Sequence, residues 1–294
     1  MKAIAMKSKV STSRTKAKKP VWFITGCSTG FGRALATQVL ERGYSVVITA
    51  RDKHDIRELA DKGDALLLKL DVTNPKQVKR AVKKALHEFG HIDVLVNNAG
   101  IGYFGAIEES EDSRVRRMFD INLFGAGSVI GAILPGMREN RSGIIVNISS
   151  IGGMCSAPAL GYYSATKFAL EGMSEALRQE VEPLGIKVMV VEPSGFRTDW
   201  AGRSAKDSKN NIKDYAATSG ANRRAIRAIS GKQRGDPVRA AQSIVDAAES
   251  KSPPHHLLLG NDAIDAALAK LTKLKKEFNL WEKVSRGADF PIGQ

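Results

Sequence analysis

The chain has 294 residues, 43% of them hydrophobic, with 27 glycines and a net charge of +14, which fits a compact globular protein of one large or two small domains. Its two cysteines, Cys27 and Cys155, are too few for a disulfide framework or a cysteine metal site. They favour a reducing compartment, and we expect a cytoplasmic protein. The five histidines show no metal-binding pattern, so no metal is expected.

The first twenty residues concentrate positive charge. Residues 1–20 hold seven lysines and arginines, no acid and little apolar content, so we expect a disordered basic leader before a single domain over 21–294. An inert tail is the favoured interpretation. An organelle transit segment and an arm that binds nucleic acid or membranes are the alternatives. Two uncharged stretches, 121–137 and 143–166, contain asparagine, glycine and proline and are expected in the interior, not in a membrane.

A strand, a glycine-rich turn and a helix open the domain. Residues 21–25 form an apolar strand, and a helix follows the turn and ends at Gly43. In the turn, Gly26 allows a tight bend, Gly30 removes a side chain that would block phosphates, and Gly32 lets the helix pack closely on the strand. This order predicts that the backbone approaches a pyrophosphate at the N-terminus of the helix.

The second strand, 45–49, completes a β-α-β unit, which should form a right-handed crossover. An acid at the end of this strand would bind the adenosine 2′-hydroxyl of NAD, but here Ala50 and Arg51 follow. A guanidinium suits a 2′-phosphate, so NADP(H) is preferred and NAD(H) is possible. The alternative is that Arg51 pairs with Asp52 or Asp55 at the surface.

Two further strands carry polar groups at their ends. Asp71 and Val72 leave the third strand, 65–73, where an adenine ring would lie. After an amphipathic helix over 75–90, the buried strand 92–100 ends in Asn97-Asn98-Ala99-Gly100. Paired amides at a strand end can tie down loops and line the adenosine side.

One long helix is expected over 110–137, with Ser110 as its N-cap. Asn122 lies inside it, where an asparagine is unfavourable and needs hydrogen-bond partners. It is either a packing residue or the anchor of a water chain beside the tyrosine and lysine described next.

The chemistry is expected in 144–167. A buried strand ends in Ser149 and Ser150, a Gly/Ser/Pro loop follows, and a helix opens near Tyr163. Tyr163 and Lys167 are four residues apart and share a helix face. A cation beside a phenol should lower its pKa from about 10 toward neutrality, which makes Tyr163 an acid/base for an alcohol or ketone. Ser150 would hold the substrate oxygen.

The remaining segments complete an α/β pattern. The sixth strand, 186–193, leads to Thr198, placed to meet a nicotinamide carboxamide, and the polar insertion 199–235 is expected to be a substrate lid. A helix over 236–250, a seventh strand over 255–260 and a terminal helix over 262–284 follow. The alternation predicts a Rossmann-type, doubly wound and predominantly parallel seven-stranded sheet flanked by helices.

Over most of 21–260 the chain resembles the short-chain dehydrogenase/reductase family. The motifs that carry the resemblance are Thr25-Gly26-x-x-x-Gly30-x-Gly32, Asp71-Val72, Asn97-Asn98-Ala99-Gly100, Asn122, Ser150 and Tyr163-x-x-x-Lys167. The family spacing of thirteen residues before Tyr163 selects Ser150 over Ser149. One departure is Pro193-Ser194-Gly195, where the family has Pro-Gly, although Thr198 keeps the family position.

The resemblance implies a mechanism. Hydride would pass between a nicotinamide and a carbonyl carbon, and Tyr163 would give or take the proton of the substrate oxygen. Lys167 would lower the pKa of Tyr163 and hold the nicotinamide ribose. Ser150 would bind the substrate oxygen, and Asn122 would support a water relay. The residues expected at the cofactor are Gly26, Ser28, Thr29, Gly30, Phe31, Gly32, Arg51, Asp71, Val72, Asn98, Ala99, Gly100, Tyr163, Lys167, Pro193, Gly195, Phe196 and Thr198. Dimers or tetramers would form through the helices at 110–137 and 163–182.

We therefore expect an NADP(H)-dependent oxidoreductase that acts on a hydrophobic ketone or secondary alcohol, as a carbonyl reductase or a steroid- or retinoid-like dehydrogenase. Phe196 and Trp200 offer an apolar lining. The alternative is a nucleotide-sensing protein on the same fold without chemistry, and retention of all four polar groups, Tyr163, Lys167, Ser150 and Asn122, argues against it. Nucleic-acid binding ranks last, so neither a nucleic-acid partner nor a membrane span is expected.

Overall fold

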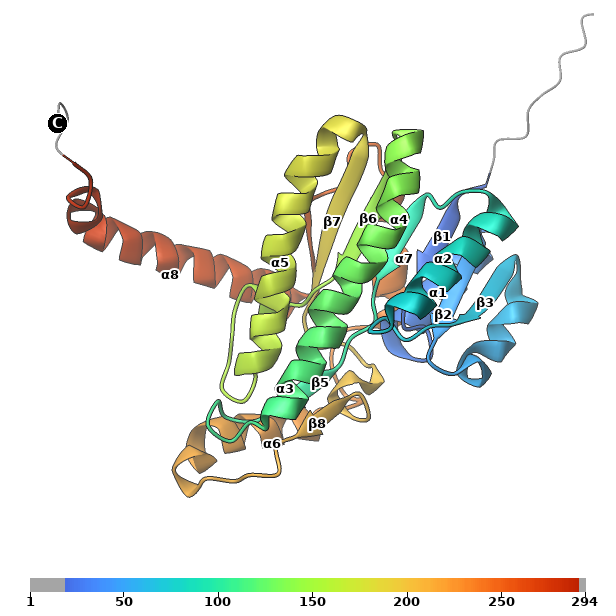
Figure 1. The fold of residues 1–294 in the computed structure, drawn as a ribbon. Helices are drawn as coiled ribbons and strands as arrows, with labels where there is room; N and C mark the ends of the chain where they lie inside the picture. Colours follow the sequence, from blue (N-terminus) through green and yellow to red (C-terminus); the bar gives the residue numbers. More distant parts are fainter. Residues whose placement is uncertain (1–18, 291–294) are drawn as a thin grey trace, which may run out of the picture.

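A seven-stranded parallel sheet forms the centre of the molecule, and its strand order is β3-β2-β1-β4-β6-β7-β9 (Figure 1). The computed structural model describes residues 19–290, so the predicted disorder of residues 1–18 lies outside the described residues. The strands are β1 Val21–Ile24, β2 Ser45–Ala50, β3 Ala65–Lys69, β4 Val94–Asn97, β6 Gly143–Ile148, β7 Ile186–Pro193 and β9 His256–Leu259. The predicted doubly wound Rossmann-type fold is confirmed.

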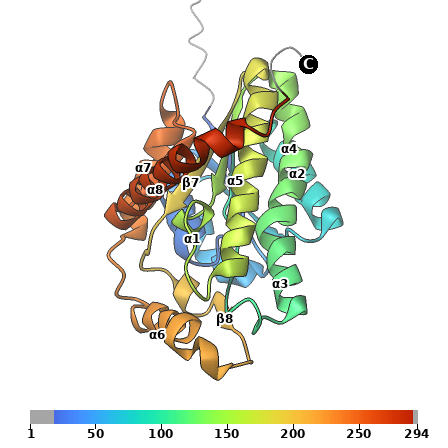
Figure 2. The ribbon, with the colours of Figure 1, turned by 90° about the vertical axis from the view of Figure 1, so that its left-hand side faces the viewer.

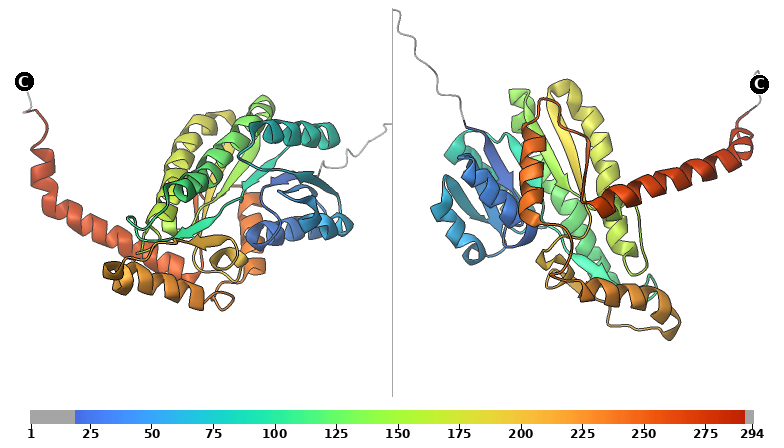
Figure 3. Two further views of the ribbon diagram at one scale, coloured as in Figure 1. Left: turned by 60° about the horizontal axis from the view of Figure 1, so that its bottom comes forward. Right: turned by 180° about the vertical axis from the view of Figure 1, so that it is seen from behind.

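Helices cover both faces of this sheet (Figures 1 and 3). The helices of the domain are α1 Gly30–Glu41, α2 Pro75–Phe89, α3 Asp112–Phe119, α4 Ala126–Asn140, α5 Gly161–Val181, α6 Ala221–Ala228, α7 Pro237–Glu249 and α8 Asn261–Arg286. Helices α1 and α7 bury their apolar side chains on one face, and α2, α4 and α5 on the other. The strand order reverses between β1 and β4, the place where open α/β sheets bind ligands.

The alternation of side chains along each strand supplies both cores. In β1, Trp22 and Ile24 pack toward α1, whereas Phe23 packs on the opposite face, and all three are buried. Successive side chains of a strand point to opposite faces, so a strand covered on both sides must be apolar throughout. This requirement explains the uninterrupted apolar runs in the sequence.

The predicted helix over 110–137 differs from the structure at its start and in its middle. Its N-cap is Glu111, not Ser110, because the Ser110 hydroxyl donates to the carbonyl of Ala106 at 2.7 Å. A π-helical turn, η2 Asp120–Gly125, separates α3 from α4. By length and composition the combined helix is the one described segment apolar enough to cross a membrane. Val129, Ile133 and Met137 bury one side of it against the sheet, which suits a core helix.

The insertion over 199–235 lies beneath the carboxyl ends of the strands (Figure 2). Its strand β8 Ala205–Asp207 pairs in parallel with β5 Gly102–Phe104, which follows β4. Arg227 of α6 donates to the carbonyls of Ala201, Gly202 and Ala205 and pairs with Asp207. The segment expected to be a lid is therefore a folded unit fixed to the chain that leaves β4.

Candidate active site

The glycine turn after β1 forms a backbone cradle. Gly26 and Gly30 have φ values of +71° and +60°, which favour glycine. A Cβ at Gly26 would lie 2.8 Å from Cα of Ala99, and one at Gly32 would lie 2.4 Å from the carbonyl oxygen of Gly26. Nearby main-chain atoms leave no room for a side chain at Gly26 or Gly32, so the N-terminus of α1 stays open to a phosphate group.

Asn98 fastens this cradle to β4. Its side-chain amide donates to the carbonyls of Thr25 and Gly26 at 2.8 and 2.9 Å. In return, the Thr25 hydroxyl accepts from the main-chain N–H groups of Asn98 and Ala99, both at 3.0 Å. Asn97 instead donates to Asn147 in the buried sheet. The two predicted amides therefore have different roles: Asn98 contacts the cradle, and Asn97 links neighbouring strands of the sheet.

Arg51 is exposed at the end of β2 and, within residues 19–290, forms no salt bridge. The predicted alternative pairing with Asp52 or Asp55 is not among the salt bridges of residues 19–290, and Asp52 accepts from the N–H of His54. The sequence analysis missed Arg33 in the first turn of α1, which pairs with Glu58. Its position directly after Gly32, the last glycine of the turn, could have indicated that Arg33 lies at the N-terminus of α1.

Asp71 and Val72 lie at the predicted place but are engaged within the protein. The Asp71 carboxylate accepts from the N–H and hydroxyl of Thr73. Partial burial opposes ionisation, but the hydrogen bonds from Thr73 and the charge of Arg117 outweigh it and lower the pKa of Asp71. Val72 is buried against Gly125, where a Cβ would come within 2.6 Å of its side chain. This close fit sets the spacing between the third strand and the π-helical turn.

Tyr163 lies in the first turn of α5 and is 7% exposed. Its ring packs against Trp200 with a centroid distance of 4.8 Å. The predicted fall of its pKa is wrong for the chain alone, because burial raises the pKa of Tyr163 to about 12, and only the Ser150 hydroxyl opposes this rise. The phenol therefore stays protonated at neutral pH.

Lys167 lies over the Tyr163 ring, but its hydrogen bond goes to the main chain. Its ammonium donates to the carbonyl of Ile148 at 2.8 Å and lies 5.9 Å from the centroid of the Tyr163 ring. Burial lowers the pKa of Lys167 to about 8, and the nearby charge of Glu171 opposes this fall. A Cβ at Gly100 would come within 3.9 Å of Nζ, so the ammonium lies at the carboxyl ends of β4 and β6, next to the switch between β1 and β4 where the sheet should open into a crevice.

Asn122 occupies the π-helical turn, and its side chain is nearly saturated. Its amide donates to the carbonyl of Ile101 at 3.0 Å and to the Thr166 hydroxyl at 3.1 Å, and its Oδ1 accepts from the N–H of Ile101. Both amide hydrogens are thus used, which fits the packing alternative better than a side-chain anchor for water. π-Helical turns occur frequently at functional sites, and this one joins α3–α4 to the segment after β4.

Two buried carboxyl groups lie behind Lys167. Glu171 is one turn further along α5, and Glu192, near the end of β7, is fully buried and 2.6 Å from Nδ1 of His256. Burial raises the pKa of Glu171, and raises that of Glu192 to about 7 against the hydrogen bond from His256. Atoms of Glu171, Glu192 and His256 lie within 4.8 Å of one another. Both oxygens of Glu171 and one oxygen of Glu192 lack hydrogen-bond partners within residues 19–290, and burial without such partners favours the protonated, uncharged form.

The segment after β7 brings Thr198 to the glycine turn. A Cβ at Gly30 would lie 3.5 Å from Cβ of Thr198, and the ring of Phe196 packs on Phe31 at 5.1 Å. The inserted Ser194 fits because a Cβ at Gly260 would lie 2.4 Å from its hydroxyl oxygen. The extra residue therefore leaves Thr198 at the crevice.

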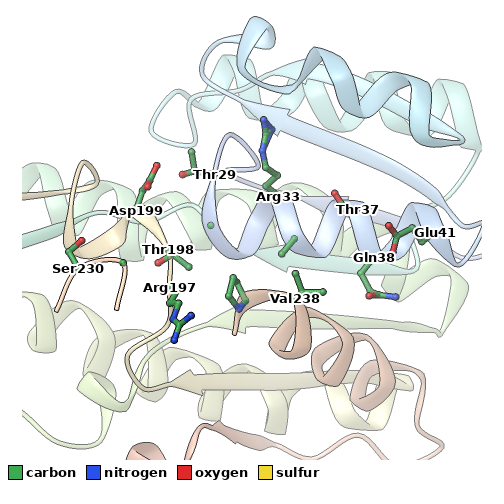
Figure 4. A pocket seen from close by; sticks show the side chains of 14 residues that line it. Thr29, Arg33, Thr37, Gln38, Glu41, Arg197, Thr198, Asp199, Ser230 and Val238 are labelled. Carbon is green, nitrogen blue, oxygen red and sulfur yellow. The ribbon is translucent and has the colours of Figure 1, made fainter. Parts of the chain in front are cut away.

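A cavity of about 590 Å³ begins at this junction and runs along α1 (Figure 4). Thr29 and Gly30 line one end together with Thr198, Val238 of α7 lies along its side, and Gln38 and Glu41 of α1 line the other end. None of Ser150, Tyr163 and Lys167 lines this cavity. These three residues lie with the glycine cradle at the carboxyl ends of neighbouring strands, as a dinucleotide site requires.

Comparison with known proteins gives the relatives of this chain. The family profile for short chain dehydrogenases matches residues 20–209. "Oxidoreductase BOA17" of Botryotinia fuckeliana is 38% identical over 90% of this chain and 97% of its own length. A "3-ketodihydrosphingosine reductase" of Bacteroides thetaiotaomicron is 38% identical over 81% of this chain and 86% of its own length.

Solved structures agree with these relatives. A short-chain dehydrogenase from Streptomyces avermitilis superposes with a TM-score of 0.87 and 41% identity, over 93% of this chain and all of that one. ElxO, solved with NADP bound, gives 0.67 and 28% identity over 82% of this chain and 96% of its own. A short chain dehydrogenase/reductase from Burkholderia phymatum, solved in complex with NAD, gives 0.76 and 25% identity over 94% of this chain and 99% of its own.

Proposed function

Because this chain belongs to the short-chain dehydrogenase/reductase family and is an NAD(P)-dependent oxidoreductase, we propose that it is an NADP(H)-dependent reductase of hydrophobic ketones. The observation that carries the proposal is the buried Tyr163 phenol, with Ser150 beside it and Trp200 over it. The opposite direction, oxidation of the secondary alcohol, uses the same groups.

The residues present fit a dinucleotide. The glycine cradle leaves room for a pyrophosphate at the N-terminus of α1, and the Lys167 ammonium faces the crevice where a nicotinamide ribose would lie. When bound, the nicotinamide supplies or accepts hydride. Thr198, held beside Gly30, is the proposed partner of its carboxamide.

The protein handles the substrate oxygen and its proton. The Ser150 hydroxyl, which already accepts from the N–H of Gly152 at 3.0 Å, would donate its own hydrogen to the carbonyl oxygen. Tyr163 would donate its proton to the same oxygen, and its raised pKa keeps that proton available at neutral pH. Trp200, packed on both Tyr163 and Phe104, would exclude water from above. Tyr163 and Ser150 are the proposed catalytic pair. Lys167 would bind and orient the nicotinamide ribose, and Asn122 would position the loop after β4.

An apolar substrate suits the walls of the site. Tyr103, Met118 and Tyr163 form a buried cluster with Leu160, Tyr162 and Trp200 packed on it. The relative named 3-ketodihydrosphingosine reductase is named for a substrate of this kind, a ketone. Residues 199–235 would form the lid that admits the substrate.

The preference for NADP(H) rests on two arginines, Arg51 at the end of β2 and Arg33 in the first turn of α1. Arg51 is free of ion pairs in the described part of the chain, and Arg33 pairs with Glu58 of the segment after β2. A guanidinium is the usual protein partner of a phosphate group. The solved relatives contain NADP in one case and NAD in another, so the chain's own cations support the preference.

The outer side of α4 and α5 is the proposed contact of a homo-oligomer. A Cβ at Gly131, Gly136 or Gly172 would meet nothing within 4 Å, and Phe124 and Phe168 are 63% and 45% exposed. We call the surface made by these five residues the bundle face. Open glycines let helices of two copies approach closely, and exposed phenylalanines gain from being covered.

Replacement of Tyr163 by phenylalanine tests the function directly. NADPH binding should stay nearly intact while turnover across a panel of hydrophobic ketones is lost, because the phenylalanine keeps the packing and removes the proton donor. Unchanged turnover would refute the role. Binding of NADPH by the wild type without turnover of any ketone would favour the nucleotide-sensing alternative.

A further inference from the structure

Helix α8 stands clear of the domain. It leaves the sheet beside β9 and runs outward (Figures 1 and 3). Ala263 and Ala267, near its start, are its only buried residues. Its 26 residues span about 39 Å at 1.5 Å per residue. A helix that packs on nothing is marginal in water, so this length of helix calls for a covering surface.

Large apolar side chains are concentrated on this helix. Seven of the fourteen strongly exposed large hydrophobic residues in the described part of the chain lie on α8, so the exposure is not scattered. They are Ile264 (42% exposed), Leu268, Leu271, Phe278, Leu280, Trp281 and Val284 (64%). A concentration of this kind marks a binding surface.

The spacing of these residues indicates the shape of the partner. Six steps of three or four residues lead through Ile264, Leu268, Leu271, Leu274, Phe278, Trp281 and Val284, which we call the α8 stripe. The mean step is below 3.6 residues, so the stripe winds around the helix axis in the left-handed sense. A flat lipid surface needs a straight stripe, whereas a winding one suits a curved protein surface.

The direction of α8 points to where that surface lies. The far half of the helix projects away from the domain and inclines toward the side of the molecule on which α3, α4 and α5 lie (Figures 1 and 2). The bundle face, with Phe124 and Phe168, is on that side. A straight helix that points away from its own domain cannot fold back onto it, but it can reach a second molecule seated on the bundle face.

We propose that α8 is an arm whose stripe packs on a second copy of this chain. In a two-fold dimer each copy would give its arm to the other, so one set of residues forms two equal contacts. The inference extends the homo-oligomer proposed above and assigns its second, independent contact. It predicts that the assembly depends on the far half of α8 as well as on the bundle face.

Sedimentation velocity of the full chain over a range of concentrations tests the arm. The double variant F278D/W281D places two charges in the stripe, and T272D/N279D places two charges at exposed positions of the same helix outside the stripe, as a matched control. We expect the wild type and control to self-associate alike, and F278D/W281D to raise the dimer dissociation constant about a hundredfold or more, as loss of buried aromatic anchors does. NADPH binding should be equal in all three, because Ala263 and Ala267 still dock the helix.

Fluorescence of Trp281 gives a second reading. Trp281 is 57% exposed in the single chain, so acrylamide quenching of its contribution, taken as the difference from Trp281→Phe, should fall as the dimer forms. The proposal is overturned if the wild type is monomeric at every concentration, or if F278D/W281D associates like the control. It is also overturned if phosphatidylglycerol vesicles bind the monomer through the stripe. If Phe168→Asp dissociates the dimer and F278D/W281D does not, the bundle face is a dimer contact and the proposed contact of α8 is refuted.

Discussion

The ammonium of Lys167 is hydrogen-bonded to the carbonyl of Ile148, the last residue of β6, at 2.8 Å. This bond joins α5 to the sheet directly behind Ser150 and fixes a buried charge at the crevice. Its consequence is that Lys167 is placed before any cofactor arrives. The same burial that holds it also lowers its pKa to about 8 and raises that of Tyr163 to about 12.

We expect the pH profile of ketone reduction to follow these two values. The phenol stays protonated over the neutral range, so kcat/KM should be flat from about pH 6 to pH 7 and should fall above about pH 8, where the free enzyme loses the Lys167 charge. Initial rates at subsaturating ketone and NADPH check this. In Lys167→Arg the charge persists, so the fall near pH 8 should disappear whatever activity remains. A fall that stays at the same pH in that variant would assign it to another group.

Replacement of Arg51 by aspartate should discriminate between the cofactors. We expect NADPH affinity to drop by about tenfold to a hundredfold, the range of one lost charge-assisted contact, with NADH affinity nearly unchanged. Fluorescence titration with both cofactors measures the ratio, and Arg57→Asp, an exposed site in the segment after β2, is the charge control. Equal losses for NADPH and NADH would show that Arg51 does not meet a 2′-phosphate.

Replacement of Asn98 by alanine should loosen the glycine cradle. Two carbonyls, those of Thr25 and Gly26, lose their side-chain donor. We expect a loss of about 1–3 kcal/mol in the free energy of unfolding, together with weaker NADPH binding. Chemical denaturation and cofactor titration measure the two effects, with Asn140→Ala at the exposed end of α4 as control. Weaker binding without any loss of stability would instead indicate a direct cofactor contact.

Glu192 should make stability depend on pH in an unusual direction. Its pKa rises from 4.5 in the unfolded chain to about 7 in the folded one. Below about pH 4.5 both states are protonated and the group costs nothing. As the pH rises toward 7, ionisation favours the unfolded chain, so this carboxyl lowers the free energy of unfolding. Glu192→Gln should therefore flatten the pH dependence of Tm between about pH 5 and 7. An unchanged slope, compared with Glu180→Gln on the exposed side of α5, would contradict this.

The sequence was sufficient to predict the features that depend on the local order of residues: the strands, the glycine cradle and the shared helix face of Tyr163 and Lys167. Uninterrupted apolar runs identified the strands of the sheet, and the position of glycines between β1 and α1 identified the cradle, because these features follow from local backbone geometry. The α5 face shared by Tyr163 and Lys167 followed from helix periodicity. Protonation did not follow, since burial of Tyr163 comes from Trp200 and from segments far away in the sequence.

A local competing bond explains one other miss, and contacts between distant segments explain the rest. Ser110 looked like an N-cap, yet its hydroxyl donates to the carbonyl of Ala106, four residues earlier. Arg33 was overlooked because its partner, Glu58, comes from the segment after β2. The π-helical turn at Asn122 has no signature in composition and is stabilised by Ile101 and Thr166.

The parallel pairing of β5 with β8 has a consequence for the order of events during turnover. Gly102 of β5 is two residues from Gly100, and Ile101 between them is bonded to Asn122. Any swing of β8 must therefore pull on the same segment that borders the cofactor crevice. A bound dinucleotide that restricts the motion of this segment would also restrict the motion of β8 and the insertion 199–235. The linkage therefore favours an ordered mechanism in which the cofactor binds before the ketone.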